Sequence, residues 1–480
     1  MNVVLINPRL RAWSPTVLVP LGLAYVAAAL EKGGHTVRVI DLNAEKVSDG
    51  CLVREVSGVD WVGITGMITE YQEVLRLTKQ IKEADNCIKV VLGGPLATSL
   101  PRELLKASLA DFVVTGEGEG TILNLFSVLK EGSNLASVKG IGYKINGQIF
   151  LTDCVEPIAN LDVIPFPARH LFNMVRYSQN LFHNFNTRIN GFSQIKSASL
   201  ITSRGCPYSC TFCYKDTWGQ KWRGRNPLNI YEEMEFLEER YGFNGFFFHD
   251  DTFVLDKKRV LQFCDVLNEK QLRVIWGCNG RVNLMTKELL GAMYQAGCRE
   301  IAYGIESGSQ KMLDLLKKNI TLEQVRNAVK WTKEAGISTN GYFMIGLPGE
   351  TKEDIRQTIA FAEELDLNFY GFSLFTPLPG TELFQFAVDK GLVKNVTSLK
   401  DWDFNVNINL TKDCSDDDLI AFQNEIFRKF TLRAFGRYYM FKPVFLKKIA
   451  TVIFSLRNWG EAREFARRAG GIIESYWHKV

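Results

Sequence analysis

Three segments decide the fold of this chain: VIWGCNGRVN (274–283), EIAYGIESGS (300–309) and GYFMIGLPGET (341–351). Each is a short apolar run that ends in glycine and polar residues, which is typical of buried strands. Between them lie TKELLGAMYQAG (286–297) and TLEQVRNAVKWTKEAG (321–336), whose apolar residues recur at helical spacing. This alternation predicts βα units and a parallel sheet, with the chemistry gathered at the carboxyl ends of the strands, as in barrels.

The segment RGCPYSCTFCYK (204–215) follows an earlier strand, ASLITSRG (198–205), and carries Cys206, Cys210 and Cys213. Soft thiolates at this spacing suit an iron–sulfur cluster, and three ligands leave one iron of a [4Fe–4S] cube open. Structural zinc is the main competitor, but it needs a fourth ligand, and no further Cys or His follows nearby. The pattern therefore predicts a cluster with one open iron.

The aromatic Phe212 just before the third cysteine completes C-x3-C-x-aromatic-C, which resembles the motif of the radical S-adenosylmethionine (SAM) superfamily. The resemblance implies a [4Fe–4S] cluster whose open iron binds SAM and cleaves it to a 5′-deoxyadenosyl radical. It also implies a low-potential electron donor of the flavodoxin or ferredoxin type. The resemblance assigns SAM contacts to Phe212, Asp250 and Asp251 (amino group), Arg281 (carboxylate), Glu306 and Ser307 (ribose and methionine end), and Ile345, Gly346 and Leu347 (adenine). For each of the three acidic residues in this set, the alternative is a place in a solvated loop or at a helix N-cap.

A second alternation of strands and helices fills the first 135 residues. Apolar strands are expected in MNVVLIN (1–7), DWVGITGM (60–67), IKVVLGGP (88–95) and DFVVTGEGEG (111–120). The pattern predicts a doubly wound parallel α/β domain, with glycines after the strands where a backbone can approach a ligand closely. No GxGxxG follows the first strand and GEGEG is not a phosphate loop, which disfavours a nicotinamide dinucleotide.

These N-terminal segments resemble the cobalamin-binding domain that is fused to many radical SAM enzymes. Classical cobalamin domains carry D-x-H-x-x-G, whose histidine binds cobalt from below, and this chain lacks that motif. Cobalamin with an unligated lower face and a domain without cobalamin both stay open. The resemblance assigns cobalamin contacts to Thr65, Met67 and Thr69, to Gly93, Gly94 and Pro95, and to Gly116, Glu117, Gly118 and Glu119.

Length and composition fit this organisation. The 480 residues predict two or three domains, and 46% hydrophobic with 23% charged residues is ordinary for a globular protein. No signal peptide opens the chain, no apolar run reaches the ~20 residues of a membrane span, and ten cysteines in so long a chain argue against a disulfide scaffold. We expect a cytoplasmic protein, and the low-potential cluster with an open iron implies a strongly reducing, anaerobic cell.

The last 53 residues, 428–480, hold twelve Lys or Arg and three Glu, a charge of +9, which leaves 4 − 9 = −5 for the first 427. Basic charge interleaved with aromatic residues fits contact with an anionic membrane surface, a cover for a greasy anionic substrate, or a helical cap on the barrel. Nucleic acid is disfavoured, because the basic run is confined to one end and no RNA module accompanies it.

The sequence thus predicts an α/β protein: a doubly wound cobalamin-type domain (1–135), a linker with a hairpin (136–190), a partial (β/α)6 radical SAM barrel (191–390) and a mainly helical, basic and aromatic region (391–480). By resemblance, the expected function is cobalamin-dependent methylation of an unactivated carbon in a small, hydrophobic substrate. The alternatives are a radical SAM oxidoreductase or cyclase acting on a tetrapyrrole or lipid, and a radical SAM enzyme with a vestigial cobalamin domain. Tyr214, Tyr303 and Tyr342 are candidate hydrogen donors, with packing as the alternative, and Cys278 is the one other cysteine that could face the rim.

Overall fold

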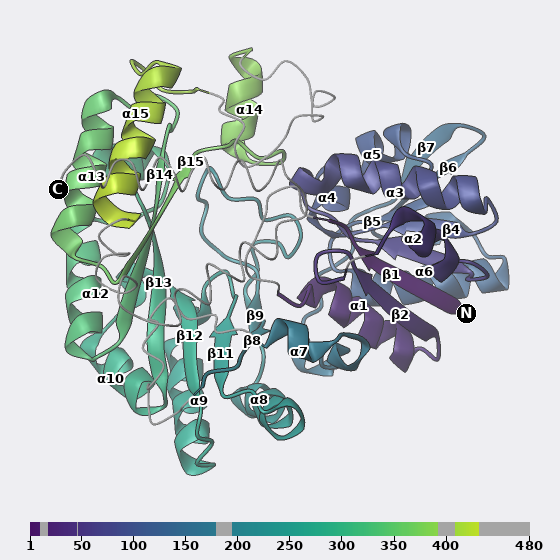
Figure 1. Cartoon of the computed structure of the whole chain (residues 1–480), viewed down its shortest axis with the longest axis horizontal. Helices are drawn as coiled ribbons and strands as arrows, with labels where there is room; N and C mark the ends of the chain where they lie inside the picture. The colour runs from purple at the N-terminus through teal and green to yellow at the C-terminus, as the bar shows by residue number, and fades with distance from the viewer. Residues whose placement is uncertain (10–17, 46, 179–193, 392–408, 432–480) are drawn as a thin grey trace. The chain divides into compact units, whose positions relative to one another are not determined.

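The computed structural model describes residues 1–9, 18–45, 47–178, 194–391 and 409–431 (Figure 1). The described residues up to Gln423 belong to one compact unit, and those from Asn424 onward to a second unit that is considered by itself. The first unit contains a seven-stranded sheet and a six-stranded sheet. The predicted α/β class, with two sheets built from separate halves of the chain, is confirmed.

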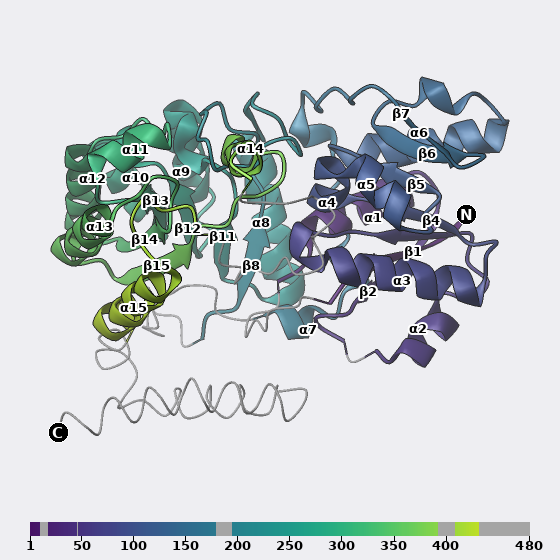
Figure 2. The same cartoon turned by 90° about the horizontal axis from the view of Figure 1, so that it is seen from above.

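The N-terminal sheet has the strand order β2-β1-β3-β4-β5-β6-β7, and Figure 2 labels all of these strands except β3. The first five strands in this order are parallel, as predicted, and β6 and β7 extend the sheet as an antiparallel hairpin. The hairpin predicted from YKINGQIF therefore pairs with the N-terminal sheet. Its strands are β1 (Asn2–Asn7), β2 (Thr36–Asp41), β3 (Trp61–Ile64), β4 (Lys89–Leu92), β5 (Phe112–Val114), β6 (Ile141–Ile145) and β7 (Gln148–Leu151).

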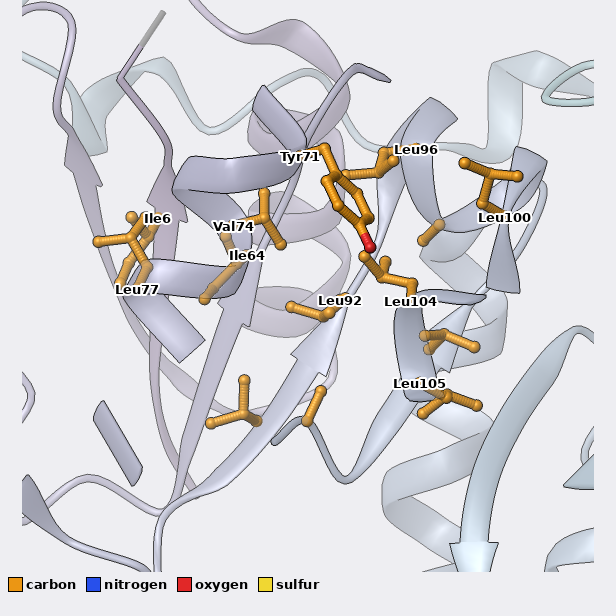
Figure 3. Close-up of a cluster of buried hydrophobic side chains, with 14 of the residues drawn as sticks. Ile6, Ile64, Tyr71, Val74, Leu77, Leu92, Leu96, Leu100, Leu104 and Leu105 are labelled. Carbon is orange, nitrogen blue, oxygen red and sulfur yellow. The ribbon is translucent and has the colours of Figure 1, made fainter. Parts of the chain in front are cut away.

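Helices cover both faces of this sheet, because its central strands are apolar on both sides. On one face the buried side chains of α1 and α6 pack on the strands, and on the other those of α2 to α5. Figure 3 shows Ile6, Ile64 and Leu92 of the strands beside Val74 and Leu77 of α3. The helices are α1 (Leu21–Lys32), α2 (Asp49–Glu55), α3 (Tyr71–Ala84), α4 (Gly94–Ser99), α5 (Pro101–Ala107) and α6 (Gly118–Glu131), with short turns η1 (Ile68–Glu70) and η2 (Leu135–Ser137).

The second sheet is a parallel half-barrel with the strand order β15-β14-β13-β12-β11-β8 (Figure 1). A separate two-stranded pair, β9 with β10, frames the segment that carries the three cysteines. The strands are β8 (Ser197–Leu200), β9 (Ser203–Arg204), β10 (Arg223–Gly224), β11 (Gly245–Phe248), β12 (Ile275–Gly280), β13 (Cys298–Glu306), β14 (Ser338–Ile345) and β15 (Phe369–Leu374).

Polar side chains start the helices that alternate with these strands. Asp256 and Thr286 accept a backbone N–H of the first turn, and Thr321 and Thr351 each form a capping box with the residue three positions on. The two predicted helices, 286–297 and 321–336, are confirmed as α10 and α12. The helices are α8 (Pro227–Tyr241), α9 (Lys257–Glu269), α10 (Lys287–Gln295), α11 (Gln310–Leu315), α12 (Leu322–Glu334), α13 (Lys352–Leu365) and α14 (Glu382–Asp389), with turns η6 (Phe253–Leu255) and η7 (Val282–Leu284).

Between the sheets run η3 (Leu161–Val163), η4 (Arg169–Leu171) and α7 (Met174–Tyr177), and after the half-barrel come α15 (Asp416–Ile426) and a π-helical turn, η9 (Phe427–Thr431). The helical character predicted for the C-terminal region is confirmed for this described part. Residues 392–408 and 432–480, and with them most of the basic, aromatic tail, lie outside the described residues.

The half-barrel strands present one side to the helices and the other to the inside of the half-barrel. The Tyr303 hydroxyl lies 2.7 Å from Thr332 Oγ1 of α12, so that Tyr303 faces the helices. Its strand neighbour Ala302 then faces inward, together with Asn340 and Phe369, its partners in register. The helix side is closed near β11 and β12 by packed rings of Phe248, Phe253, Phe263 and Trp276.

This ring cluster yields a stability prediction. Phe263 is fully buried, so Phe263→Ala should leave a cavity and cost about 3–5 kcal/mol of apparent unfolding free energy. Phe236→Ala is the control: Phe236 is an exposed ring on α8, and its loss should cost under ~1 kcal/mol. Urea unfolding followed by tryptophan fluorescence measures both, and equal losses would contradict the packing described here.

Candidate functional site

The predicted SAM contacts all lie in loops that follow strands of the half-barrel or at the ends of those strands. Because neighbouring strands are parallel, these loops meet at one edge of the sheet. They are the cysteine segment, which follows β8 by way of the short strand β9, Asp250 to Thr252 after β11, Arg281 after β12, Glu306 to Ser309 at the end of β13, and Gly346 to Glu350 after β14.

The cysteine loop (residues 205–222) is held at its base by the pairing of Arg204 with Arg223. Gly205 has a φ of +83°, and a Cβ at this position would lie 2.4 Å from the Lys221 carbonyl oxygen. Only glycine combines that backbone conformation with so close an approach. The Cys206 N–H donates to the Gly219 carbonyl at 3.4 Å, which closes the base of the loop.

All three loop cysteines are free thiols. The surrounding protein raises the pKa of Cys213 to about 11, first by desolvation and then through the negative charge of Asp251 and the two other thiols. Three free thiols of one loop, close enough to act on one another's charge, fit an iron–sulfur cluster by their chemistry. Among the described residues no three His, Cys, Asp or Glu side chains are gathered closely enough to hold a metal ion, so cluster binding requires these thiols to turn toward a common point.

The two aspartates after β11 lie in different surroundings. Asp250 is fully buried and accepts hydrogen bonds from the Thr202 N–H (2.6 Å), the Thr202 hydroxyl (2.5 Å) and the Ser203 hydroxyl (2.6 Å). These contacts tie it to the strand that enters the cysteine loop. Asp251 is exposed, and its pKa is raised to about 6 by desolvation and by the charge of Asp250. Of the pair, Asp251 is therefore the carboxylate that a ligand can reach.

Arg281 and Glu306 are joined through a residue that the sequence analysis did not single out, Lys318. The Lys318 ammonium lies 2.7 Å from a Glu306 carboxylate oxygen, and the Lys318 carbonyl accepts a hydrogen bond from Arg281. The Arg281 guanidinium lies 3.6 Å from the ring centroid of Tyr208, and Lys318 lies 5.7 Å from that of Phe212. The Nε of Arg281 is buried without a partner in the described structure. Arg281 and Lys318 therefore contact two of the aromatic residues of the cysteine loop, Tyr208 and Phe212.

Glu306 itself has a φ of +71°, at an irregularity in the pairing of β13 with β14. A non-glycine residue in this conformation is strained, and such strain concentrates at functional positions. A Cβ on Gly304 would lie 2.5 Å from Glu306 and 3.0 Å from Lys318, so the absent side chain makes room for their ion pair.

The predicted adenine and ribose contacts are positioned by hydrogen bonds from α13 and from the loop before it. Ser307 shares a hydrogen bond with Thr358 of α13 at 3.0 Å. The N–H groups of Gly346 and Leu347 donate to one oxygen of Glu350, at 2.6 and 3.0 Å. The side chains of Ile345 and Leu347 are buried, so this segment presents its backbone to the rim. Glu350, which the sequence analysis did not select, is the residue that shapes it.

Two neighbouring glycines in the predicted cobalamin loops of the N-terminal sheet differ in the space beside them. A Cβ on Gly93 would meet no atom within 4 Å. Gly94 has a φ of +82°, and its Cβ would lie 2.6 Å from the Thr65 hydroxyl. Thr65 and Gly94 are half-buried, and Met67 and Pro95 are exposed. Open backbone beside exposed side chains fits the edge of a large planar ligand, whereas the Thr69 hydroxyl is buried and donates to Glu70 at 2.6 Å.

In the last predicted cobalamin segment, Gly116 to Glu119, both carboxylates are buried and already paired. Glu117 lies 3.3 Å from Arg204 and 2.8 Å from Arg223, and Glu119 lies 2.5 Å from Arg204. The Gly116 N–H donates to the Thr98 hydroxyl at 3.0 Å. The two carboxylates are thus turned to the base of the cysteine loop, a role that the sequence analysis did not foresee.

The candidate hydrogen donors differ in their exposure. Tyr303 is fully buried on the helix side, so packing explains it. Tyr342 is exposed, and the Tyr214 hydroxyl is buried with no partner in the described structure. Cys278 is fully buried and adjoins Cys298, and burial raises the pKa of Cys278 well above its usual range. Cys278 therefore packs in the core of the half-barrel.

Known proteins match this arrangement of sheets and loops. Residues 200–362 match the radical SAM superfamily, and residues 10–126 match the B12 binding domain. An uncharacterized methyltransferase of Pyrococcus horikoshii is 34% identical over 378 residues, which cover 78% of this chain and 79% of the relative. The anaerobic magnesium-protoporphyrin IX monomethyl ester cyclase of Rubrivivax gelatinosus is 30% identical over 77% of this chain and 66% of its own length.

The chain therefore belongs to the radical SAM enzymes that carry an N-terminal B12-binding domain. The fold agrees: the radical SAM methyltransferase TsrM from Kitasatospora setae, solved with cobalamin and a [4Fe–4S] cluster, superposes with a TM-score of 0.67 over 82% of this chain and 75% of its own, at 21% identity. In the described part of the chain, no helix combines the length and the apolar character that crossing a membrane requires.

The close contact at Gly205 leads to a prediction for cluster loading. Gly205→Ala should cost ~1–3 kcal/mol at the base of the loop through backbone strain and the clash with the Lys221 carbonyl, and should at least halve the iron retained per chain after anaerobic reconstitution. Gly22→Ala is the control, because a Cβ there meets no atom within 4 Å. Iron and sulfide analysis of both variants is the measurement. A Gly205→Ala variant that retains as much iron as the wild type would contradict the close contact at the base of the cysteine loop.

The buried carboxyl of Glu350 leads to a pH prediction. Desolvation raises the pKa of Glu350 to about 7 from the 4.5 of an ordinary glutamate, against the lowering effect of the two N–H groups that donate to it. The folded protein then holds a proton that the unfolded chain has lost, so Glu350 makes stability fall by up to about 3 kcal/mol as the pH rises from about 4.5 to 7.

Glu350→Gln keeps an oxygen for the Gly346 and Leu347 N–H groups but cannot ionise. The unfolding free energy of the wild type minus that of this variant should therefore decrease between pH 5 and pH 7.5. Chemical denaturation at several pH values measures this difference, and a difference that does not change with pH would show that Glu350 titrates normally.

Proposed function

We propose that this chain methylates an unactivated carbon of a small hydrophobic molecule, using cobalamin, SAM and a [4Fe–4S] cluster. The single observation that carries the proposal is the joining of two loops by buried ion pairs: the loop of three free thiols and the glycine-flanked β5–α6 loop of the B12-binding domain. The P. horikoshii relative is named a methyltransferase, which supports methyl transfer.

When bound, the three cofactors supply a methyl group and a hydrogen-abstracting radical, so the protein has to hold them, position the reacting carbon and exclude water. Cys206, Cys210 and Cys213 would hold the cluster. The exposed Asp251 and the free Nε of Arg281 are suited to the charged ends of SAM. The open backbone at Gly93 would face cobalamin.

The inner face of the half-barrel supports a hydrophobic substrate. Strand register places Phe247, Tyr342, Met344 and Phe369 on the inward side, with the carboxylate of Glu300 on the same face. The same register also places the polar side chains of Ser197, Ser199, Asn279 and Asn340 on this face. Aromatic and thioether side chains combined with a few placed polar groups are typical of small-molecule sites. A flavodoxin- or ferredoxin-type donor would supply electrons, and contact of the basic tail with a membrane surface is part of the proposal; most of that tail lies outside the described residues.

Cyclisation or oxidation is the second candidate, because the R. gelatinosus cyclase is 30% identical over 77% of this chain. The two reactions differ in what they make from SAM. Methyl transfer yields S-adenosylhomocysteine in addition to 5′-deoxyadenosine, whereas cyclisation or oxidation yields 5′-deoxyadenosine alone.

The first test is to reconstitute the purified protein anaerobically with iron and sulfide, add hydroxocobalamin, desalt it and count the metals. We expect roughly four irons and one cobalt per chain, and both SAM products after reduction. Four irons without cobalt, or 5′-deoxyadenosine without S-adenosylhomocysteine, would contradict methyl transfer.

Cys206→Ala should reduce 5′-deoxyadenosine to the level of a protein-free sample, because a cluster thiolate is lost. Cys154→Ala, at an exposed cysteine, is the matched control and should leave product formation unchanged. Zinc in place of iron in the reconstituted protein would overturn the assignment of the cysteine loop.

A further inference from the structure

Four buried charged residues connect the B12-binding domain with the base of the cysteine loop. They are Glu117 and Glu119, which flank the start of α6, and Arg204 and Arg223, which pair as β9 and β10. We refer to them as the bridging charges. Their side chains are between 2% and 9% exposed, and two carboxylates balance two guanidinium groups.

Glu117 is the centre of the bridging charges. Its carboxylate contacts both arginines, at 3.3 Å and 2.8 Å, and also accepts the N–H of Ile158 at 2.6 Å. Arg223 in turn donates to the Ile158 carbonyl at 2.8 Å and to the Trp218 carbonyl at 2.9 Å. One side chain of the B12-binding domain thus fixes both strands that enter and leave the cysteine loop.

The bridging charges lie next to both candidate cofactor loops along the chain. Glu117 follows Gly116 of the β5–α6 loop directly, and Arg204 is separated from Cys206 only by Gly205, whose backbone lies close to the Lys221 carbonyl. Arg204 is held from its other side by the rings of Tyr25 and Trp218, at 5.2 and 5.8 Å. A shift of the β5–α6 loop should therefore also move Cys206, because only a few rotatable backbone bonds separate Arg204 from Cys206.

Apolar packing continues across the same junction. The hydrophobic cluster on the α3–α5 side of the N-terminal sheet extends into Leu316, Leu347 and Phe384 of the half-barrel, and Phe212 of the cysteine loop packs against it. Apolar packing stabilises the contact but does not depend strongly on orientation. Paired buried charges fix one geometry, because any other arrangement leaves a charge unpaired.

We propose that Glu117 is a positioning residue that couples the two cofactor sites. It fixes the position of the cysteine loop relative to the β5–α6 loop, so that cobalamin bound at the β5–α6 loop strengthens SAM binding at the cysteine loop. By linkage, SAM bound to the cluster strengthens cobalamin binding by the same factor. This inference rests on the proposed use of both cofactors, and it concerns binding, whichever reaction follows.

The experiment measures hydroxocobalamin affinity by visible absorbance, anaerobically, on cluster-reconstituted full-length protein with and without SAM. We expect SAM to tighten cobalamin binding at least about fivefold in the wild type. Glu117→Gln should lower this ratio to about one while the protein still binds roughly four irons. The electron paramagnetic resonance spectrum of its reduced cluster should also change less on SAM addition than that of the wild type.

Three further variants separate positioning from general stability. Glu117→Asp keeps the charge and should restore at least half of the coupling ratio. Glu364→Gln removes a carboxylate from an exposed ion pair with Arg326, 2.5 Å apart, and should behave as the wild type. If Glu117→Gln does not fold, Glu119→Gln is measured in its place, because it removes one bridging contact and leaves Glu117 paired; its ratio should then be reduced.

The outcomes are distinct from those of the proposed function. A wild-type protein that binds no cobalamin overturns both proposals. A wild type that binds both cofactors with a coupling ratio of one, or a Glu117→Gln variant with the wild-type ratio, overturns the coupling alone. Loss of the ratio in Glu117→Gln with rescue in Glu117→Asp supports it.

Discussion

Two glutamates, Glu117 and Glu233, each hold two arginines in the interior around the cysteine loop. Glu117 holds Arg204 and Arg223, and Glu233 of α8 holds Arg169 and Arg225. Burial alone would raise the pKa of Glu233, but its two arginines hold it below its ordinary range. Buried charges of this kind contribute little net stability against an apolar alternative, yet removing one partner is costly. These buried ion pairs therefore restrict the geometry of β8, β9 and β10 more than they add to the stability of the fold.

The buried Asp250 shows the same constraint closer to the cysteines. Arg259 of α9 donates to the Thr202 hydroxyl at 2.6 Å, and that hydroxyl lies 2.5 Å from Asp250. Asp250, Thr202 and Arg259 thus form a chain of hydrogen bonds from the helix layer to the strand that enters the loop. A fully satisfied buried network of this kind specifies a single arrangement. The cysteine loop itself is more open, which leaves room for its thiols to turn toward a cluster.

The strands, the helices and the cysteine motif could be predicted from the sequence, whereas ion pairs between residues far apart in the chain could not. The strands around Trp276, Tyr303 and Phe343 and the helices between them follow from local periodicity and capping residues, and the C-x3-C-x2-C spacing locates the thiols. Lys318 could not be found in this way, because its pairing with Glu306 depends on the path of the chain through α11. Arg204 meets Glu119, a residue of helix α6 that lies 85 positions earlier in the chain, and no local pattern records that.

The same distinction explains why the predicted contacts divide into two groups. Asp250, Ser307, Glu117 and Glu119 were selected for their positions after strands, and the structure uses their side chains to hold loops in place. Strand ends in a parallel sheet need such anchors, because each loop leaves several backbone groups without a sheet partner. Polar residues at a rim therefore serve either the ligand or the loop, and their hydrogen bonds decide which. By that criterion Asp251, Met67 and the open backbone at Gly93 are accessible to a ligand, whereas the buried carboxylates hold the loops in place.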